Sequence, residues 1–410
     1  MLYVEQGIKN IGVLLVRIFI AIFVLSLFQP SMLNAGSSIS CLSRIKSTDA
    51  FLVADQTGHI LQTKNAGIKC IPASTLKVLT SLAAIHYLHG TYRFRTEFYI
   101  DPDGNLKIKG YGDPLLISEV LLNIADILAK KVGDIKDIIV DDTFFSPDII
   151  IPGRNLSTNP YDAPVGALCA NFNTVFFDRD QGGSIISAEP QTPMVPFALK
   201  KIKSLGLKKG RYTFSHEPHD PARYMGELLL YFLKQRGIKV WGGIRSGIVE
   251  HGDTLVYTYR SCFALEAVLK KMMEFSNNFI ANQVFITMGA DVYGPPGTLT
   301  KGVRSVSEFA RDELRLKDVK IVEGSGISRE NRMSALDMLV ILRRFEPYKC
   351  LLNRRGNFIF KTGTLNGVRT RAGYIEGQGE GLCYFVIFLN RPGADIESLM
   401  ECVKNLGEYN

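Results

Sequence analysis

PASTLK, residues 72–77, begins an apolar segment that ends at Gly90. Proline and serine are typical of the first positions of a helix, and glycine is typical of the position after its last turn. Leucines recur between these two ends at roughly helical spacing, which is the pattern of a helix with a buried face. The segment therefore predicts a helix that begins beside Ser74 and ends at Gly90.

Ser74 and Lys77 are three residues apart, so a helix places them on the same face. A serine nucleophile needs a base, and a lysine whose pKa is lowered by burial or by a nearby cation can act as one. The amides at a helix N-terminus suit a developing oxyanion. The spacing favours a nucleophile and its base, while the alternative interpretation is that Ser74 only caps the helix. A second Ser-x-x-Lys, Ser43 to Lys46, lies in a polar stretch without such a helix.

Two further short motifs follow in the chain. Ser276-Asn277-Asn278 lies inside a segment, 263–290, that we predict to be helical, and Lys361-Thr362-Gly363-Thr364 opens from a predicted strand. Each alone could be a polar helix face or an ordinary turn. Together, in the order Ser-x-x-Lys, Ser-x-Asn, Lys-Thr-Gly, they are typical of penicilloyl-serine transferases and β-lactamases.

The order of the helix and strand patterns along the chain predicts an α+β fold with more than one domain. A chain of 410 residues is longer than a domain with one hydrophobic core usually is. A hairpin pattern near the start and three strand patterns near the end flank helical segments, which predicts a catalytic domain from residues 42–90 and 258–410, with a central antiparallel sheet flanked by helices. Residues 91–257 have short strands with glycine and proline between them, so we expect an inserted β-rich domain there.

The first 35 residues have the pattern of an export signal. Lys9 and Arg17 precede the apolar run Ile18–Phe28, and Gln29, Pro30 and a small residue at Ala35 follow it. This run is shorter than the about 20 residues that a membrane span needs. We expect a signal peptide or an uncleaved N-terminal anchor over residues 1–35, and hence an exported protein.

Composition excludes several classes of function. The net charge is +8, but the basic residues are scattered and form no block interleaved with aromatics, which argues against nucleic-acid binding. The seven cysteines include no Cys-x-x-Cys pair and predict no disulfide framework. His216 and His219 flank a proline at a spacing unsuited to a metal. We predict no metal and no cofactor.

Beyond the motifs, the chain from about residue 50 to 390 resembles the low-molecular-mass penicillin-binding proteins of the D-alanyl-D-alanine carboxypeptidase/endopeptidase type, peptidase family S13 or class C. The blocks that carry this resemblance are 72–90, 110–116, 137–145, 160–175, 323–335 and 361–375. Two departures stand out: Glu323 replaces the usual aspartate before Gly-Ser-Gly, and the GYGDP sequence of residues 110–114 replaces a more glycine-rich version.

The resemblance implies acyl transfer through a covalent intermediate. Ser74 would attack the carbonyl of the penultimate D-alanine while Lys77 accepts its proton, and Ser276 would relay a proton to the leaving nitrogen. The backbone amides of Ser74 and Thr364 would form the oxyanion hole. The residues implied in substrate binding are Asn278 for the side-chain amide, Lys361 and Thr362 for the terminal carboxylate, with Gly363 and Thr364 beside them. Gly324-Ser325-Gly326 either flanks the cleft or forms a plain turn.

The implied substrates are peptidoglycan peptides ending in D-Ala-D-Ala, with β-lactams as inhibitors, in the periplasm or at the outer face of the bacterial inner membrane. Peripheral or N-terminal membrane association is compatible with residues 1–35. A β-lactamase is the first alternative, but the Glu-x-x-x-Asn of Glu119 to Asn123 precedes the Ser-x-Asn motif instead of following it. A non-catalytic scaffold that binds wall peptides is the second, and the intact motifs argue against it.

Overall fold

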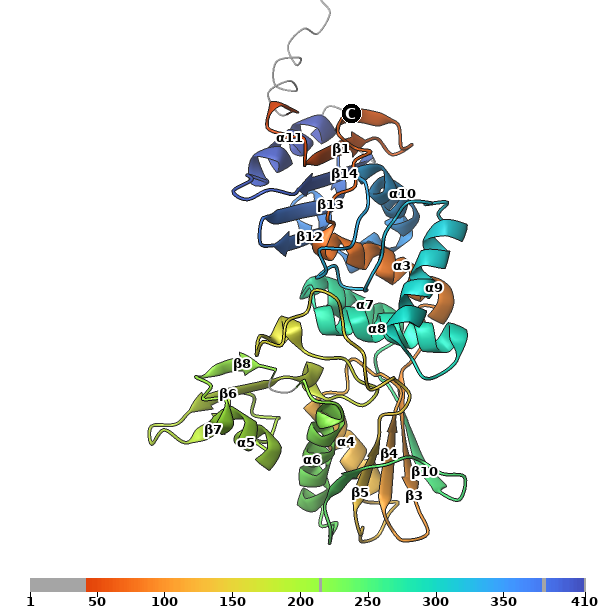
Figure 1. Cartoon of the computed structure of the whole chain (residues 1–410), viewed down its shortest axis with the longest axis vertical. Coiled ribbons are helices and arrows are strands. Elements are labelled where there is room, and N and C mark those ends of the chain that lie inside the picture. The colour runs from red at the N-terminus through yellow and green to blue at the C-terminus, as the bar shows by residue number, and fades with distance from the viewer. Residues whose placement is uncertain (1–41, 214–215, 378–380, 409–410) are drawn as a thin grey trace, which may run out of the picture. The chain divides into compact units, whose positions relative to one another are not determined.

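A computed structural model describes residues 42–213, 216–377 and 381–408 (Figure 1). The chain divides into two units, Met1–Ile45 and Lys46–Asn410, and the fold below is that of the second. The predicted signal or anchor over residues 1–35 lies outside the described residues. None of the helices in the described ranges is both long and apolar enough to cross a membrane.

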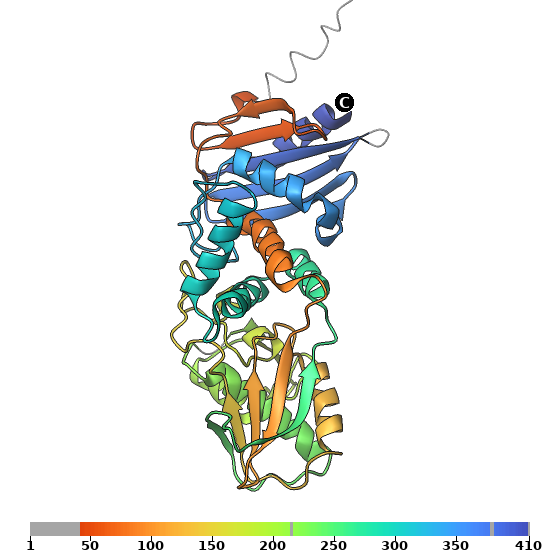
Figure 2. The same ribbon diagram turned by 90° about the vertical axis from the view of Figure 1, so that its right-hand side faces the viewer.

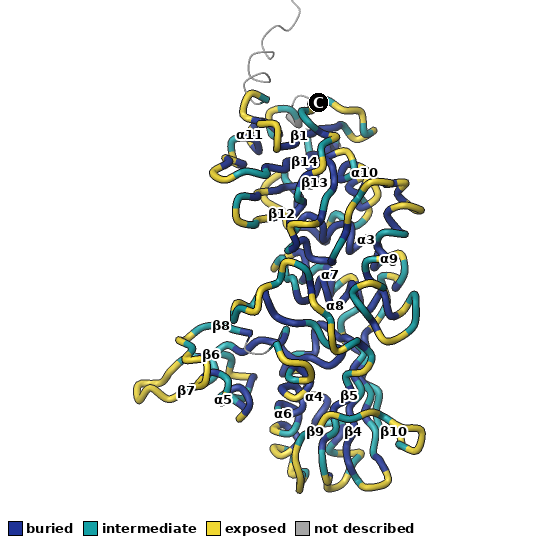
Figure 3. The backbone as a smooth tube through the Cα atoms, in the orientation of Figure 1, coloured by how far each residue is buried: buried dark blue, intermediate teal, exposed yellow. Residues whose placement is uncertain are grey.

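A six-stranded antiparallel sheet joins the two ends of the second unit, in the order β11-β12-β13-β14-β1-β2. Its strands are β1 (Ala50–Ala54), β2 (Ile60–Lys64), β11 (Asn353–Arg355), β12 (Phe358–Leu365), β13 (Val368–Glu376) and β14 (Leu382–Leu389). Every residue of β1 and β14 is buried, as expected for strands covered on both faces (Figure 3). The predicted α+β fold with a central antiparallel sheet is confirmed.

Helices pack against this sheet or against one another. They are α3 (Lys77–Leu88), α7 (Leu265–Glu274), α8 (Asn278–Tyr293), α9 (Leu299–Asp312), α10 (Ala335–Phe345) and α11 (Glu397–Glu408). Helix α10 packs against β14, and α11 lies along β13 and β14 on the other face of the sheet (Figures 1 and 2). These helices supply the flanking layers that the sequence predicts.

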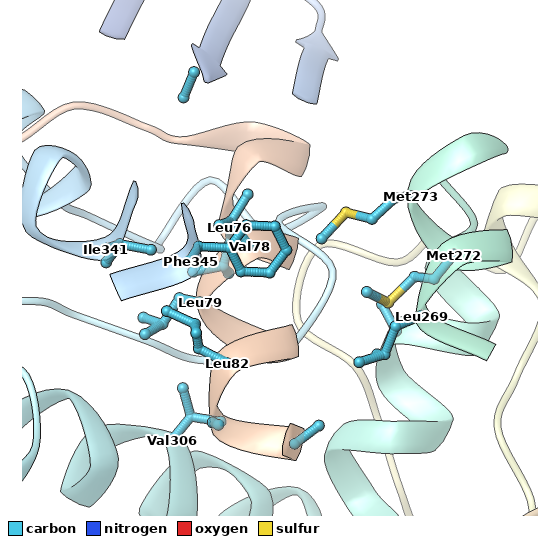
Figure 4. Close-up of a cluster of buried hydrophobic side chains, with 14 of the residues drawn as sticks. Leu76, Val78, Leu79, Leu82, Leu269, Met272, Met273, Val306, Ile341 and Phe345 are labelled. Carbon is cyan, nitrogen blue, oxygen red and sulfur yellow. The ribbon is translucent and has the colours of Figure 1, made fainter. Parts of the chain in front are cut away.

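Helix α3 is the centre of the core. All residues from Lys77 to Ala84 are buried, the pattern of a helix surrounded by other elements. Figure 4 shows its Leu79 and Leu82 among side chains of α7, α9 and α10. A short 3-10 turn, η1 (Ala73–Leu76), precedes it and packs against β12 and β13. The residues at the start of α3 are therefore held from several sides.

Residues 95–213 and 216–260 form two smaller sheets and three α-helices. The five-stranded sheet has the order β10-β3-β4-β5-β9, and the three-stranded sheet the order β7-β6-β8. Their strands are β3 (Arg95–Ile100), β4 (Leu106–Gly110), β5 (Ile138–Asp141), β6 (Val175–Arg179), β7 (Ile185–Ser187), β8 (Gly210–Tyr212), β9 (Ile244–Ser246) and β10 (Thr254–Arg260). The helices are α4 (Ser118–Leu128), α5 (Pro196–Ser204) and α6 (Asp220–Gln235). Their side chains form a second hydrophobic cluster, while the boundaries of the inserted domain stay a prediction.

One prediction is wrong. We expected a single helical segment over residues 263–290, but α7 ends at Glu274 and α8 begins at Asn278. The Asn277 backbone N–H donates to Met272 O at 3.1 Å, and Ser276 is left-handed with φ 51°, so the chain leaves α7 through a tight turn. The Asn277 side chain then caps α8 by accepting from the Ile280 backbone N–H at 2.9 Å.

Candidate active site

Ser74 lies in a tightly packed turn. Ala73 before it is left-handed, with φ 48°, a conformation that costs a non-glycine residue of the order of 1 kcal/mol or more. Two glycines let neighbouring backbone reach the turn: a Cβ on Gly363 of β12 would lie 2.8 Å from Ser74 N, and one on Gly326 would lie 1.9 Å from Ala73 O. The position of the Ser74 backbone amide is thus set by two other segments of the chain.

Lys77 is fully buried beside Ser74. Its Nζ lies 3.0 Å from Ser74 Oγ, 2.9 Å from Asn278 Oδ1 and 2.6 Å from Ser325 O. Burial, and then the charge of Lys361, lower the pKa of Lys77 well below its usual value, although Glu323 acts in the opposite direction. A neutral amine has two N–H groups for the two carbonyl oxygens and one lone pair for the Ser74 hydroxyl. The geometry suits a base for Ser74.

Lys361 reaches the other side of the site from β12. Its Nζ donates to Ser276 Oγ at 2.8 Å and to Thr362 O at 2.8 Å. Burial lowers the pKa of Lys361 to about 8. The left-handed turn at Ser276, which the predicted continuous helix would not have produced, points its hydroxyl at this cation.

The predicted residues meet at one cavity of about 840 Å³, whose walls include Ser74, Ser276, Asn278, Thr362 and Thr364. Lys77 and Lys361 are buried behind the serines to which they hydrogen bond, and Gly363 is buried against the Ser74 turn. The structure therefore brings together all eight residues that the sequence singled out, although they come from three distant segments.

The cavity also has walls that the sequence did not predict. They include Asn155, Tyr161, Ser328, Arg329 and Asn366. Asn278 Nδ2 donates to the Tyr161 backbone O at 3.4 Å, which joins the loop of residues 153–162 to the start of α8. All of them except Asn155 lie in blocks that carry the family resemblance, but no catalytic motif singles them out, because only the tertiary fold brings their loops and turns to the cavity.

One edge of β12 is open beside the cavity. Strand β11 pairs with Phe358, Ile359 and Phe360 only, so the stretch Lys361–Leu365 lies beyond that ladder. An extended peptide can add to such an edge through main-chain hydrogen bonds. Thr362 and Thr364 are exposed along this stretch, while Lys361 and Gly363 are buried.

Glu323 organises the third wall of the site. Its carboxylate is fully buried and accepts hydrogen bonds from several groups of the same loop and from one side chain of α8. The donors are Ser325 N and Oγ, Gly326 N, Ser328 N, Asn331 Nδ2 and Asn282 Nδ2. This network holds the Ser325 carbonyl against Lys77, so Gly324-Ser325-Gly326 contacts the site. In the sequence, Glu323 stood out only as a departure from the usual aspartate of the family. The signal that could have indicated its role is a carboxylate next to a Gly/Ser turn.

We expect Glu323→Gln to slow acylation by benzylpenicillin about 5- to 100-fold, because an amide NH₂ would then face backbone N–H donors, at a cost of about 1–3 kcal/mol. Loss of the carboxylate charge also removes the effect that raises the pKa of Lys77, so the acid limb of the pH–rate profile should move to lower pH. Acylation reactions quenched at timed intervals over pH 4–9 measure both the rate and the position of the acid limb. Glu313→Gln, an exposed change, is the control; an unmoved acid limb would contradict the charge argument.

The two histidines of the His216–His219 segment have other partners. His216 Nε2 lies 2.8 Å from Ser157 O, and His219 Nδ1 lies 2.9 Å from Asp142 Oδ2. Within residues 42–213, 216–377 and 381–408, no group of three or more His, Cys, Asp or Glu side chains could hold a metal ion.

Comparisons with known proteins agree on one family. The sequence model described as the D-Ala-D-Ala carboxypeptidase 3 (S13) family matches residues 44–209 and 187–351. A curated relative, the D-alanyl-D-alanine carboxypeptidase of Actinomadura sp. (strain R39), is 24% identical over 435 aligned positions, which cover 87% of this chain and 80% of the relative.

Solved structures share the fold. Penicillin binding protein 4 (dacB) from Haemophilus influenzae matches with a TM-score of 0.74 and 20% identity, covering 92% of this chain and 100% of that one. The penicillin G-acylated endopeptidase Bd3459 from Bdellovibrio bacteriovorus matches with a TM-score of 0.50 and 15% identity, covering 87% and 90%. At these identities the likeness concerns the fold alone.

Proposed function

Because the chain belongs to the D-Ala-D-Ala carboxypeptidase 3 (S13) family, we propose that it is a penicillin-sensitive, serine-type D-alanyl-D-alanine carboxypeptidase, endopeptidase or both, which acts on peptidoglycan stem peptides through an acyl-enzyme on Ser74. The observation that carries the proposal is the buried Lys77 amine 3.0 Å from Ser74 Oγ. Burial disfavours the charged form of Lys77 and lowers its pKa, which favours the neutral amine that can accept the Ser74 proton.

In the acylation step, Ser74 Oγ forms a bond to the carbonyl carbon of the penultimate D-alanine and its proton passes to Lys77 Nζ. The tetrahedral intermediate then breaks its C–N bond. Ser276, hydrogen bonded to Lys361 at 2.8 Å, relays to the leaving nitrogen the proton that Lys77 took from Ser74, so that Lys77 is neutral again for the deacylation step. Free D-alanine departs in the carboxypeptidase reaction, and a second stem peptide departs in the endopeptidase reaction. Water hydrolyses the ester and restores Ser74.

Binding uses the open edge of β12. The substrate backbone adds beside Thr362 and Thr364, with its terminal carboxylate held by Lys361 through a charge-assisted contact and by the Thr362 hydroxyl. The backbone amides of Ser74 and Thr364 stabilise the oxyanion, each such donor being worth about 3 kcal/mol. The near approach of Gly363 to Ser74 N supports this pairing of the two amides. Asn278 holds the side-chain amide of the substrate.

Two observations favour a peptidase over a β-lactamase. Glu119, which the Glu-x-x-x-Asn spacing offers as a deacylation base, lies on α4 and lines a different cavity from Ser74. The Bdellovibrio endopeptidase that shares the fold is described in its penicillin G-acylated form. A slow release of the penicilloyl group is therefore the expected behaviour here.

The setting is a further part of the proposal. The charged, apolar and small-residue order of residues 1–35 supports export to the periplasm or the outer face of the inner membrane, with this segment removed or kept as an anchor. The catalytic domain comprises residues 42–90 and 258–410, and the inserted domain residues 91–257.

The test is the intact mass of the purified full chain after brief incubation with benzylpenicillin, together with D-alanine release from a pentapeptide and cleavage of a cross-linked dimer. A lasting adduct of one penicilloyl group with cleavage of either peptide is the expected result. Rapid hydrolysis of the drug without an adduct would indicate a β-lactamase. A folded protein with no adduct and no hydrolysis would indicate a binding scaffold.

The activity should also fall at alkaline pH. Lys361 is charged below its pKa of about 8 and neutral above it, so the attraction for the substrate carboxylate is present at low pH and lost as pH rises. We expect kcat/KM for the pentapeptide to fall about tenfold per pH unit well above pH 8. In Lys361→Arg the fall of kcat/KM should begin at a higher pH, whatever the absolute rate of this variant. A limb that stays in place in this variant would show that another group titrates.

A further inference from the structure

A second cavity, of about 510 Å³, shares a wall with the active-site cavity. Asn277 and Pro160 line the second cavity, whereas their neighbours Ser276, Asn278 and Tyr161 line the first. The same two turns of the chain therefore face both cavities. Its size lies in the range of about 300–1,000 Å³ that is usual for sites that hold small organic ligands.

Aromatic rings line the second cavity. Phe172, Phe263 and Phe275 come from three separate segments, and the ring of Phe275 is 67% exposed, so a ligand in the cavity can reach it. Phe172 sits in η3 (Asn171–Asn173), where all three residues have positive φ of 51–58°. Such strain in non-glycine residues persists where the fold enforces it and is concentrated at binding and active sites.

The charges at this cavity balance. Arg211 donates to Glu189 at 2.5 Å, and Lys271 and Glu119 add one charge of each sign. A balanced set of charges gives no net attraction for an anionic stem peptide. Gln191 is exposed beside them and offers an amide. Aromatic faces with amides at the rim suit a neutral ligand that has both apolar faces and polar edges.

We propose that the second cavity binds the N-acetylated disaccharide of the wall polymer while the peptide attached to that sugar enters the active site. This inference rests on the proposed function. Sugar rings present C–H faces that pack on aromatic rings, and their acetamido and hydroxyl groups pair with amides such as Gln191 and Asn277. The turns at Asn277 and Pro160 form the wall between the two cavities. A stem peptide spans up to about 3.5 Å per residue and can therefore reach from one cavity to the other.

The experiment compares kcat/KM for D-alanine release from a disaccharide-pentapeptide and from the same pentapeptide without sugar. The wild-type chain should prefer the sugar-bearing substrate about tenfold, and Phe275→Ala should lower this preference roughly three- to tenfold, the usual worth of one aromatic contact. Hydrolysis of the free pentapeptide should be unchanged. Trp241→Ala, which removes another aromatic ring that is 71% exposed and lines neither cavity, is the matched control.

Gln191→Ala is the second variant, because Phe275 adjoins Ser276 and its loss could disturb the turn. Equal kcat/KM for the two substrates in the wild type would overturn the inference, as would a preference that survives both changes. A sugar-free cross-linked dimer that is preferred as strongly would assign the cavity to a second peptide instead.

Binding of the peptide-free disaccharide, followed by saturation-transfer NMR, needs no catalysis. We expect saturation transfer to the disaccharide in the wild type and in Trp241→Ala, and weaker transfer in Phe275→Ala. The absence of transfer in the wild type would overturn the inference. Cleavage of the free pentapeptide reports separately on the proposed function, so a failure of one remains distinguishable from a failure of the other.

Discussion

The Ser74→Ala protein should form no penicilloyl adduct and should release D-alanine at least about 10⁴-fold more slowly than the wild type. Loss of the nucleophile removes the covalent route, and only binding and oxyanion stabilisation remain, as in other serine hydrolases. The hydroxyl lost is half-exposed at the cavity, so the substitution leaves the packing of Lys77 and α3 largely intact. Intact mass measures the adduct, and a coupled D-amino-acid assay measures the release.

The chain supplies a matched control for this change. Ser43 and Lys46 repeat the Ser-x-x-Lys spacing outside the site, so Ser43→Ala removes the same hydroxyl from the same local pattern. We expect wild-type acylation in that protein. An adduct that persists in Ser74→Ala and disappears in Ser43→Ala would reverse the assignment of the nucleophile.

Lys77→Met should have the second largest effect, a loss of about 10²–10⁴-fold in acylation rate, because it removes the general base while keeping a long side chain in a fully buried site. The substitution also leaves Asn278 Oδ1 and Ser325 O without the donor at 2.9 and 2.6 Å. Part of the loss in acylation rate therefore comes from displacement of Asn278 and Ser325 and not from the missing base. The measurement is the second-order rate of benzylpenicillin acylation near pH 7.

Two checks separate chemistry from folding. Circular dichroism and the melting temperature establish that Lys77→Met is folded, and Lys46→Met tests the lysine of the other Ser-x-x-Lys pattern. Acylation within about tenfold of the wild type in a folded Lys77→Met protein would mean that another group, such as Lys361, accepts the Ser74 proton.

Much of the fold was predictable because its signals are local. The hairpin of β1 and β2, the start of α3 and the three strands β12, β13 and β14 follow from alternation, helical spacing and turn residues. The break at Ser276 was missed because three helix-neutral polar residues do not by themselves end a helix. The turn forms because Asn277 caps α8 and its backbone returns to Met272.

The eight predicted site residues were identified from motif order, which is a property of the chain alone. The role of Glu323 was not, because a buried carboxylate surrounded by donors is a property of the folded loop. The same holds for the second cavity, whose lining comes from segments between Leu115 and Ile280 that share no motif.

The sequence by itself determined that Ser74 and Lys77 stand one turn apart, since that relation depends only on local backbone geometry. Only the tertiary structure decided that the lysine can act as a base. Its partners Asn278 and Ser325 lie 201 and 248 residues away in the chain, and Lys361 approaches from β12. Desolvation and the field of a second cation lower the pKa of a lysine, and both exist only once distant segments have excluded water from around it.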